Sequence, residues 1–422
     1  MGLPYQGNAG GDMMNCKLLL IIILFLILSM APGAVTGNEI DLLALPWEEI
    51  EAIASGQTVH MYMWGGNNGT NNFIDQWIAP RLKERYHISL ERVPVTDIRE
   101  MIIKILTEKQ MGKSTGSADI LWINGENFRL AMEKGLLWAP FTFILPNYMR
   151  YVDPSADDLN MDFGKATEGY EAPWGKAQFV MICNSEFVPI PPDTMEELAE
   201  FIMENPGRFT YPSPPDFTGS CFIRQVILAK TSGPGNHSSK EGSEDAPGRR
   251  SEAWNFLNDL KPCLWRQGRT YPETVGILDQ LYSNGEVWFT MNYNPLHAFN
   301  KISQGSFPES SRTFLFRNGT FSNTHYLTIP FNAKSKAGAL VAIDLFLSPE
   351  GQFEKLKPHV WGDGIVLDPS RMDPEQRRIL EDIGSGPSSL SPEILAMKRI
   401  PEFSSQEIES IEKEWLEEVG KK

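Results

Sequence analysis

Cysteine and histidine are scarce in this chain, with 4 Cys and 6 His among 422 residues. No C-x-x-C pair occurs, and the histidines at 60, 87, 237, 297, 325 and 359 show no H-E-x-x-H or other metal-ligand spacing. We therefore expect no metal site and no cofactor. Cys16 precedes the mature chain predicted below, so three cysteines remain and at least one is unpaired. The sequence does not decide whether Cys221 and Cys263 form a disulfide.

Basic charge is also low. The chain has 38 Lys+Arg against 54 Asp+Glu, a formal net charge of -16. A surface of this sign does not favour nucleic acid or anionic lipid, so we expect no nucleic-acid partner. The simplest role of the excess acidic charge is solubility.

Long apolar runs are absent except for one, Leu18–Leu28. It follows Lys17 and precedes small, turn-prone residues, and it is short for a membrane span, which needs about 20 residues. This order predicts a secretory signal peptide over residues 1–37, with an upstream overhang at its start and cleavage between Gly33 and Asn38. An uncleaved N-terminal anchor is the alternative. Either way we expect export to the periplasm or the cell exterior.

Enzyme motifs are missing or misplaced. "GKSTG" (112–116) matches the nucleophile pattern G-x-S-x-G, but a predicted helix precedes it and a strand follows, the reverse of the required order. The same glycine-lysine-serine would end a phosphate loop only if Thr107 were glycine, and Trp64 stands where a dinucleotide loop needs its first glycine. No carboxylate pair has an acid/base context. We predict a protein that is not an enzyme; an exported hydrolase using Ser114 is the weaker alternative.

Apolar periodicity is what the chain does have. Strand patterns at 58–64, 88–95 and 118–123 alternate with helical patterns, which predicts a parallel sheet with helices on its faces. A second α/β unit begins after residue 175, with predicted strands at 177–184, 207–214 and 285–295 and a helix at 216–230. Residues 231–250 lack core-forming side chains and predict a mobile insertion.

Three loops, "WGGNNG" (64–69), "NGEN" (124–127) and "FTGS" (217–220), each join a predicted strand to a helix. Ligands of open parallel sheets bind outside the carboxyl ends of the strands, glycines expose backbone N–H groups there, and tryptophan offers a flat face to rings and cations. We therefore predict a solute cleft lined by Trp64, Gly65, Asn67, Asn68, Asn124, Glu126, Asn127, Trp174, Asp216, Thr218, Ser220, Trp288 and Asn292.

The chemistry of these residues favours an organic cation, because aromatic faces and the carboxylates of Glu126 and Asp216 both attract positive charge. A sugar would also accept aromatic stacking and asparagine hydrogen bonds. Ferric iron ranks lower, since Tyr62, Tyr211 and Tyr293 are scattered along the chain.

Several stretches carry a family resemblance: "YMWGGNNGTNNFID", "GSADILWINGENF", "PWGKAQFVMICN", "NPGRFTYPSPPDFTGSCF" and "IPFNAKSKAGALVAIDLFLSPEGQ". In this order the chain resembles the extracellular solute-binding proteins of ABC importers, in particular their YnjB-like branch, which is allied to iron, thiamine and polyamine binders. The resemblance implies an α/β, type II periplasmic-binding-protein fold, in which two α/β lobes are joined by two crossing strands with a ligand cleft between them.

The same resemblance implies boundaries and a function. Residues 173–182 and 323–329 would be the crossing strands, residues 38–175 and 328–422 lobe one, and residues 176–327 lobe two. The protein would capture a small solute by hinge closure and deliver it to an ABC permease in the membrane, which a separate ATPase powers. The alternative is a ligand-sensing module for a membrane receptor.

Overall fold

The computed structural model describes residues 1–2, 41–231, 249–383 and 388–421. The predicted signal peptide, apart from its first two residues, and nearly all of the predicted insertion lie outside this part of the chain. The chain divides into two compact units, Met1–Leu45 and Pro46–Lys422. The first contributes the 3-10 turn η1 (Leu42–Ala44), and everything below concerns the second. Within the described residues, no helix has the length and apolarity needed to cross a membrane.

The first sheet has the order β11-β10-β3-β1-β2, with β6 beside β10. Its strands are β1 (Thr58–Trp64), β2 (Ser89–Val95), β3 (Ile120–Ile123), β6 (Glu171–Gln178), β10 (Thr320–Thr328) and β11 (Arg399–Pro401). The parallel pairing of β1 with both β2 and β3 confirms the predicted parallel sheet, whereas β10 runs antiparallel to β3 and β6.

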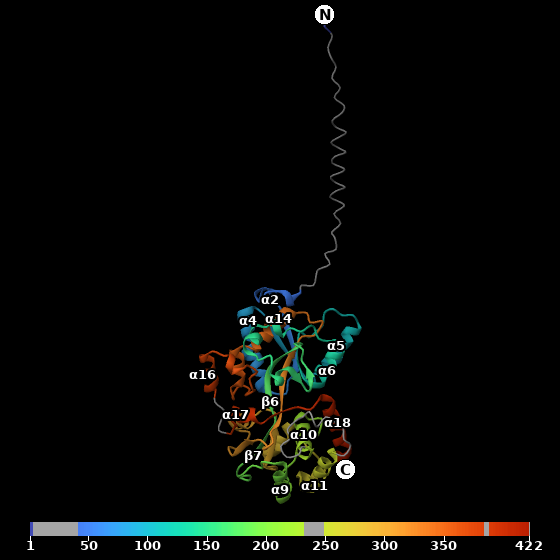
Figure 1. Ribbon diagram of the computed structural model, residues 1–422, viewed down its shortest axis with the longest axis vertical. Helices are drawn as coiled ribbons and strands as arrows, with labels where there is room; N and C mark the ends of the chain where they lie inside the picture. Colours follow the sequence, from blue (N-terminus) through green and yellow to red (C-terminus); the bar gives the residue numbers. More distant parts are fainter. Residues whose placement is uncertain (3–40, 232–248, 384–387, 422) are drawn as a thin grey trace. The chain divides into compact units, whose positions relative to one another are not determined.

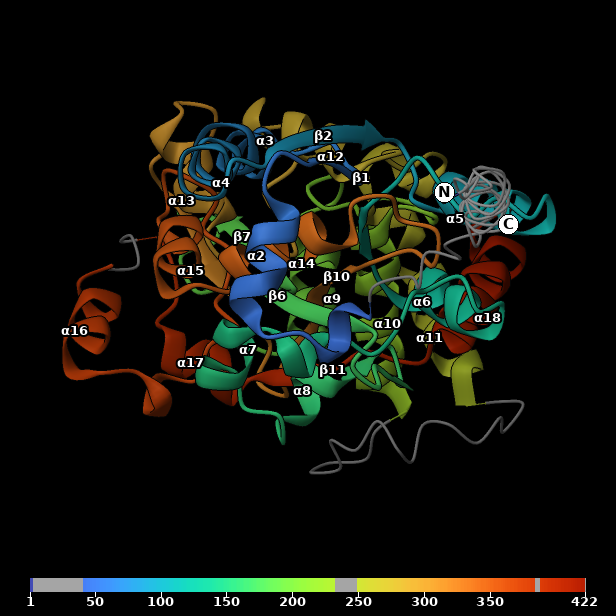
Figure 2. The same cartoon turned by 90° about the horizontal axis from the view of Figure 1, so that it is seen from above.

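Helices cover this sheet with their apolar residues. In α5 (Arg99–Gln110), for example, the residues at helical spacing, Met101, Ile102 and Ile105, are buried against the sheet core. Figure 2 shows α2 beside α14, where the Gln57 amide oxygen accepts a hydrogen bond from Gly338 N. The other elements here are α2 (Trp47–Ala54), α3 (Asn68–Asn72), η2 (Phe73–Ile78), α4 (Ala79–Tyr86), α6 (Gly125–Glu133), η3 (Thr142–Ile144), α7 (Pro146–Tyr151), α8 (Asp157–Asn160), the hairpin β4 (Met161–Asp162) and β5 (Lys165–Ala166), α14 (Lys336–Phe346) and α15 (Pro349–Leu356).

The second sheet is antiparallel, in the order β8-β7-β9, and consists of β7 (Val180–Asn184), β8 (Phe289–Asn292) and β9 (Ser311–Phe314). The strand predicted at 207–214 is wrong: these residues form no strand, and prolines 212 and 214 have no N–H to donate to a ladder. Around the sheet lie α9 (Met195–Glu204), α10 (Phe217–Thr231), α11 (Arg249–Leu260), η4 (Lys261–Cys263), η5 (Trp265–Gly268), α12 (Val275–Ser283) and α13 (His297–Ser303).

The strands β6 and β10 connect the two sheets. They pair antiparallel from Ser322↔Gln178 to Thr328↔Glu171, with a register shift between His325 and Tyr326. After Gln178 the chain passes directly into β7 of the second sheet. In Figure 1, β6 and β10 run side by side between the helices α5, α6 and α14 and the helices α9, α10 and α11. These are the segments predicted to cross; the lobe boundaries remain a prediction.

The C-terminal segment packs differently from the expectation that all of 328–422 belongs to lobe one. It contains η6 (Pro369–Arg371), α16 (Pro374–Asp382), α17 (Pro392–Met397), β11, α18 (Ser405–Trp415) and η7 (Leu416–Gly420). Its apolar residues Ile400, Ile411 and Trp415 join the core of the second sheet, together with Phe179 and Phe222. Helical periodicity predicts that such a face is buried, but not against which core.

The cysteines of the described part, Cys183, Cys221 and Cys263, are free thiols, so the disulfide left open by the sequence is not formed. Cys221 instead accepts a hydrogen bond from the Tyr293 hydroxyl at 3.0 Å.

Candidate functional site

The loops after β1 and β3 lie at one edge of the first sheet, because the two strands are parallel neighbours. Trp64 ends β1 with half of its surface exposed (50%). Its ring covers Gly66, where an added Cβ would lie 2.1 Å from the indole. An added Cβ at Gly65 would lie 2.6 Å from the Pro94 side chain, which is also too close, so the loop needs both glycines. The loop after β1 is therefore a tight turn beneath an exposed indole.

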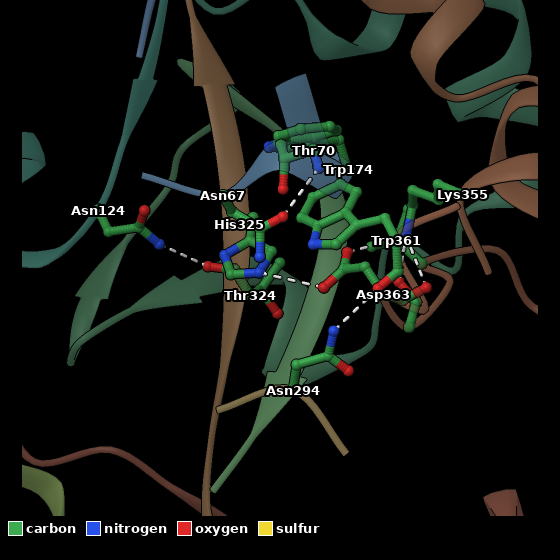
Figure 3. Close-up of polar contacts among 12 residues, drawn as sticks. Asn67, Thr70, Asn124, Trp174, Asn294, Thr324, His325, Lys355, Trp361 and Asp363 are labelled. Carbon is green, nitrogen blue, oxygen red and sulfur yellow. Dashed lines mark hydrogen bonds and ion pairs between the residues drawn. The ribbon is translucent and has the colours of Figure 1, made fainter. Parts of the chain in front are cut away.

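The asparagines of this loop have distinct roles. Asn67 caps α3, its side-chain oxygen accepting from Thr70 N at 3.0 Å, while Asn68 is exposed. Asn124, after β3, donates its side-chain amide to the Thr324 carbonyl at 2.7 Å (Figure 3). This bond ties the β3–α6 loop to the crossing strand β10. The backbone N–H of Asn127 in turn donates to the Asn124 carbonyl at 3.3 Å.

The acidic candidates already have partners. Glu126 pairs with Arg99 at 2.9 Å, and its hydrogen bond to Glu409 is the main cause of the raised pKa of Glu409. Asp216 accepts from Gly219 N at 2.8 Å and from Val275 N at 2.9 Å, while burial raises its pKa above the ordinary value. Asp216 thus caps α10 and holds the first turn of α12.

Two predicted residues of the third loop are inside the protein. Thr218 and Ser220 are both buried, and the Ser220 hydroxyl donates to Glu412 at 2.6 Å and accepts from Arg224 at 2.7 Å. Phe217, the first residue of α10, has its ring centroid 6.3 Å from that of Phe163. An added Cβ at Gly125 would lie 3.4 Å from the same Phe163 ring, so Phe163 bridges the starts of α6 and α10.

Trp174 belongs to a cluster that we call the aromatic wall, made of Trp122, Trp174, His325 and Trp361. Trp122 stands edge-on to Trp174 at 5.2 Å and to His325 at 5.0 Å, and Trp361 lies 5.0 Å from Trp174 and nearly parallel to His325 at 6.0 Å. Trp174 is fully buried, and its indole N–H has no hydrogen-bond partner among the described residues. Trp174 therefore backs this wall rather than facing solvent.

An ionic group lies behind the aromatic wall (Figure 3). Asp363 Oδ1 lies 3.2 Å from His325 Nε2, and Asp363 Oδ2 accepts a hydrogen bond from Lys355 Nζ at 3.0 Å. Burial lowers the pKa of the Lys355 ammonium, an effect that the charge of Asp363 opposes. At Gly175 an added Cβ would lie 2.0 Å from the Asp363 carboxylate, so only glycine fits there.

Trp361, His325 and Asp363 were not among the predicted site residues. The stretch "WGDG" (361–364) resembles the opening "WGG" of the first loop in its tryptophan and glycines, and this was the signal that could have found it. His325 and Thr324 offered no such signal, because only the pairing of β10 with β3 and β6 brings them here.

The two candidates on β8 lie at opposite ends of that strand. Asn292 pairs with Val180, next to the crossing strands, and its side-chain oxygen accepts from Asn294 N at 2.9 Å. Trp288 precedes the other end, where it stacks on Phe187 at 4.7 Å with the rings 7° apart. The structure thus brings Asn292 toward the crossing strands and does not bring Trp288 together with the other candidates.

Two carboxyl groups are buried near the start of α6. Asp162 accepts from Gly125 N at 2.6 Å, whereas its second oxygen and both oxygens of Glu171 have no hydrogen-bond partner among the described residues. Burial is the main cause of a pKa raised well above the ordinary range in both groups, and the charge of Asp162 raises that of Glu171 further. The Tyr326 hydroxyl beside them donates to the Met161 carbonyl at 3.2 Å.

Other chemistries find little support in the described part of the chain. Its His, Cys, Asp and Glu side chains form no group of three or more that could hold a metal ion. Ser114 lies in the turn between α5 and β3, so the helix-then-strand order predicted around it is confirmed. This is not the strand–turn–helix that presents a nucleophilic serine.

Comparison with known proteins gives a consistent result. A family model described as bacterial extracellular solute-binding protein matches residues 77–373. Protein YnjB of Escherichia coli (strain K12) is 40% identical over 380 residues, which cover 89% of this chain and 95% of YnjB.

Solved structures share the fold at low sequence identity. The periplasmic binding protein AfuA from Actinobacillus pleuropneumoniae, with fructose-6-phosphate bound, is 16% identical with a TM-score of 0.58, covering 87% of this chain and 99% of AfuA. The spermidine/putrescine substrate-binding protein PotD from Streptococcus pneumoniae is 13% identical with a TM-score of 0.59, covering 86% and 98%. These structures confirm the predicted type II periplasmic-binding fold.

Proposed function

Because the chain belongs to the bacterial extracellular solute-binding proteins, the solute-binding components of ABC transporters, we propose that it captures a small organic cation on the exposed face of Trp64, beside the aromatic wall. This is a family of binding proteins, not of enzymes. The observation that carries the proposal is the half-exposed indole of Trp64 at the carboxyl end of β1. A cation over such a face contributes about 0.5–2 kcal/mol of binding free energy.

Trp122, Trp174 and Trp288 are less able to bind a solute than Trp64, because their rings are packed against other side chains. Trp174 is buried, Trp288 is stacked on Phe187, and Trp122 is packed edge-on against its neighbours. Since Glu126 and Asp216 are already engaged by Arg99 and by backbone N–H groups, the attraction for positive charge rests on the ring face. The exposed Asn68 and the amide of Asn292 would supply polar contacts from the two sheets.

Delivery completes the proposed function. The solute-loaded form, closed about β6 and β10, would dock on a membrane permease driven by a separate ATPase. Sensing for a membrane receptor is the alternative, and neighbouring permease and ATPase genes would distinguish the two. A secreted, N-terminally processed or anchored chain serves either role.

The test begins with mass spectrometry of the small molecule that co-purifies with the mature protein. Thermal unfolding is then measured with spermidine, thiamine or fructose 6-phosphate, since PotD is a spermidine/putrescine substrate-binding protein and AfuA has fructose 6-phosphate bound. We expect the cations to raise the melting temperature, because a ligand stabilises the state it binds. If fructose 6-phosphate alone stabilises the protein, the solute is a sugar rather than an organic cation.

Two variants locate the site. Trp64→Ala should weaken binding of the stabilising cation by roughly 2- to 30-fold, the loss of about 0.5–2 kcal/mol of cation–π energy, with little change in the stability of the free protein. Trp265→Ala is the matched control, since Trp265 is a partly buried indole of the second sheet whose N–H donates to Glu286 at 3.2 Å. Equal losses of affinity in both variants would contradict a platform at Trp64.

A further inference from the structure

The turn Trp361–Gly364, which follows α15, contacts the first sheet, a crossing strand and the second sheet. Its contacts with the first sheet involve the predicted cleft loop. An added Cβ at Gly69 would lie 2.6 Å from the Val360 carbonyl and 3.4 Å from the Trp361 Cα, so the glycine-rich loop rests directly on the start of this turn. The Trp361 side chain belongs to the aromatic wall, and Asp363 bonds to His325 and Lys355.

The same turn is fastened to the crossing strand β6. Gly364 N donates to the Lys176 carbonyl at 3.1 Å, and Lys176 N donates to the Gly364 carbonyl at 3.0 Å. Gly175 admits the Asp363 carboxylate into the space where another residue would place its Cβ. The turn is therefore aligned with the strand that leads from the first sheet to the second.

Two asparagines that follow β8 of the second sheet also contact the turn: Asn294 lies in the loop after β8, and Asn300 lies in α13. Asn294 and Asn300 both donate their side-chain amides to the Trp361 carbonyl, at 2.9 and 3.2 Å, and Figure 3 shows the first of these bonds. Gly362 has a φ of +76°, and an added Cβ there would lie 2.9 Å from the Leu296 side chain. The backbone of the turn thus packs directly against the side chains of Asn294, Leu296 and Asn300.

We propose that the Trp361 carbonyl is a positioning group that couples the two sheets: by accepting from Asn294 and Asn300 it holds the segment after β8 against the turn that carries the aromatic wall and supports the Trp64 loop. The role of this coupling in solute capture rests on the proposed function. A solute that shifts the Trp64 loop or Trp361 then also moves the Trp361 carbonyl, to which Asn294 and Asn300 are hydrogen-bonded. Asn294 and Asn300 are positioning residues, since they act through Trp361.

Variants can remove the donors with little change of shape. Asn294→Asp keeps the side-chain oxygen that accepts from Leu296 N at 2.8 Å and replaces the amide donor with a negatively charged carboxylate oxygen, which the Trp361 carbonyl repels. Asn300→Leu removes a donor whose companion oxygen has no hydrogen-bond partner among the described residues. The matched control is Asn205→Asp, because the Asn205 amide also donates to a backbone carbonyl, that of Phe201 at 3.0 Å, but within one helix end.

The measurement is amide hydrogen exchange of the mature protein without added solute, read in peptides covering 292–300 and 360–364. We expect both variants to accelerate exchange in both peptides by roughly twofold to tenfold, the effect of losing one neutral hydrogen bond, and the control to change neither. A failure of spermidine or thiamine to bind leaves this test unaffected, so the two proposals can fail separately.

Two results would overturn the coupling. One is exchange that rises at 292–300 but stays at the wild-type rate at 360–364, which would mean that the turn does not depend on the second sheet. The other is an unchanged rate in both peptides. Circular dichroism confirms folding first, and if Asn294→Asp does not fold, Asn300→Leu alone decides between these outcomes.

Discussion

The buried carboxyl groups of Asp162 and Glu171 should make the stability of the protein depend on pH in an unusual direction. In the unfolded chain these groups have pKa values of about 3.9 and 4.3. In the folded chain burial raises both pKa values well above that range. Between the unfolded and folded values, the native state therefore binds more protons than the unfolded state. Their contribution to stability is fully present below the unfolded pKa values and is lost as the pH rises through the folded ones.

The magnitude follows from proton linkage. Each carboxyl that stays protonated in the native state and ionises in the unfolded state lowers the free energy of unfolding by about 1.4 kcal/mol per pH unit. Glu171→Gln mimics the protonated form and removes one such group. Relative to the wild type, the variant should thus gain about 1.4 kcal/mol of stability for each pH unit between the unfolded pKa of Glu171 and its raised folded pKa.

Urea unfolding of the wild type and Glu171→Gln at several pH values measures this difference. Glu84→Gln, which neutralises an exposed carboxyl on α4, serves as the control and should track the wild type. The reasoning is refuted if the difference between Glu171→Gln and the wild type does not change with pH. Such a result would mean that Glu171 is ionised in the folded protein.

Three further predictions concern packing and export. Trp174→Ala should lower the free energy of unfolding by about 3–5 kcal/mol, because it truncates a fully buried aromatic side chain, and thermal or urea unfolding measures this; a loss below 1 kcal/mol would contradict its place in the core. Glu402→Gln should cost about 3–5 kcal/mol because it leaves Arg224, now 3.0 Å from Glu402, buried without its counter-ion. Adding Arg224→Met should restore part of that loss, and a double variant as unstable as the single one would argue against the ion pair as the cause. N-terminal sequencing of the exported protein should start between Ala34 and Glu39, whereas a product retaining Leu18–Leu28 would indicate the anchor.

Local signals in the sequence predicted the local structure well. The strand predicted at 58–64 matches β1 residue for residue, and Thr194 and Ser348, which are residue types that favour helix starts, cap α9 and α15. These signals depend on contacts within a few residues. The prediction of a strand at 207–214 was wrong because it gave more weight to the apolar residues than to the prolines. In the structure the prolines have no N–H to donate to a β-ladder, and the segment forms no strand.

The site was predictable only in part, because much of it depends on contacts between distant segments. The loops after β1 and β3 could be placed together, since parallel strands share an edge. Nothing local indicates that Trp361 would meet Trp122, or that the second carboxylate oxygen of Asp216 would accept a hydrogen bond from Val275 N. Those outcomes are set by packing across more than 50 residues of chain, which periodicity and spacing do not report.

The burial of the C-terminal segment in the second core affects the order in which the protein can be completed. Phe179 and Phe222 share their core with Ile411 and Trp415, near the last residues of the chain. During synthesis, therefore, the apolar core residues in the middle of the chain stay exposed until α18, which carries Ile411 and Trp415, has been made. Until it is complete, such a chain can still pass through a membrane channel as an extended polypeptide. For a protein whose destination lies across a membrane, late closure of one core keeps the polypeptide in the unfolded form that can still be moved.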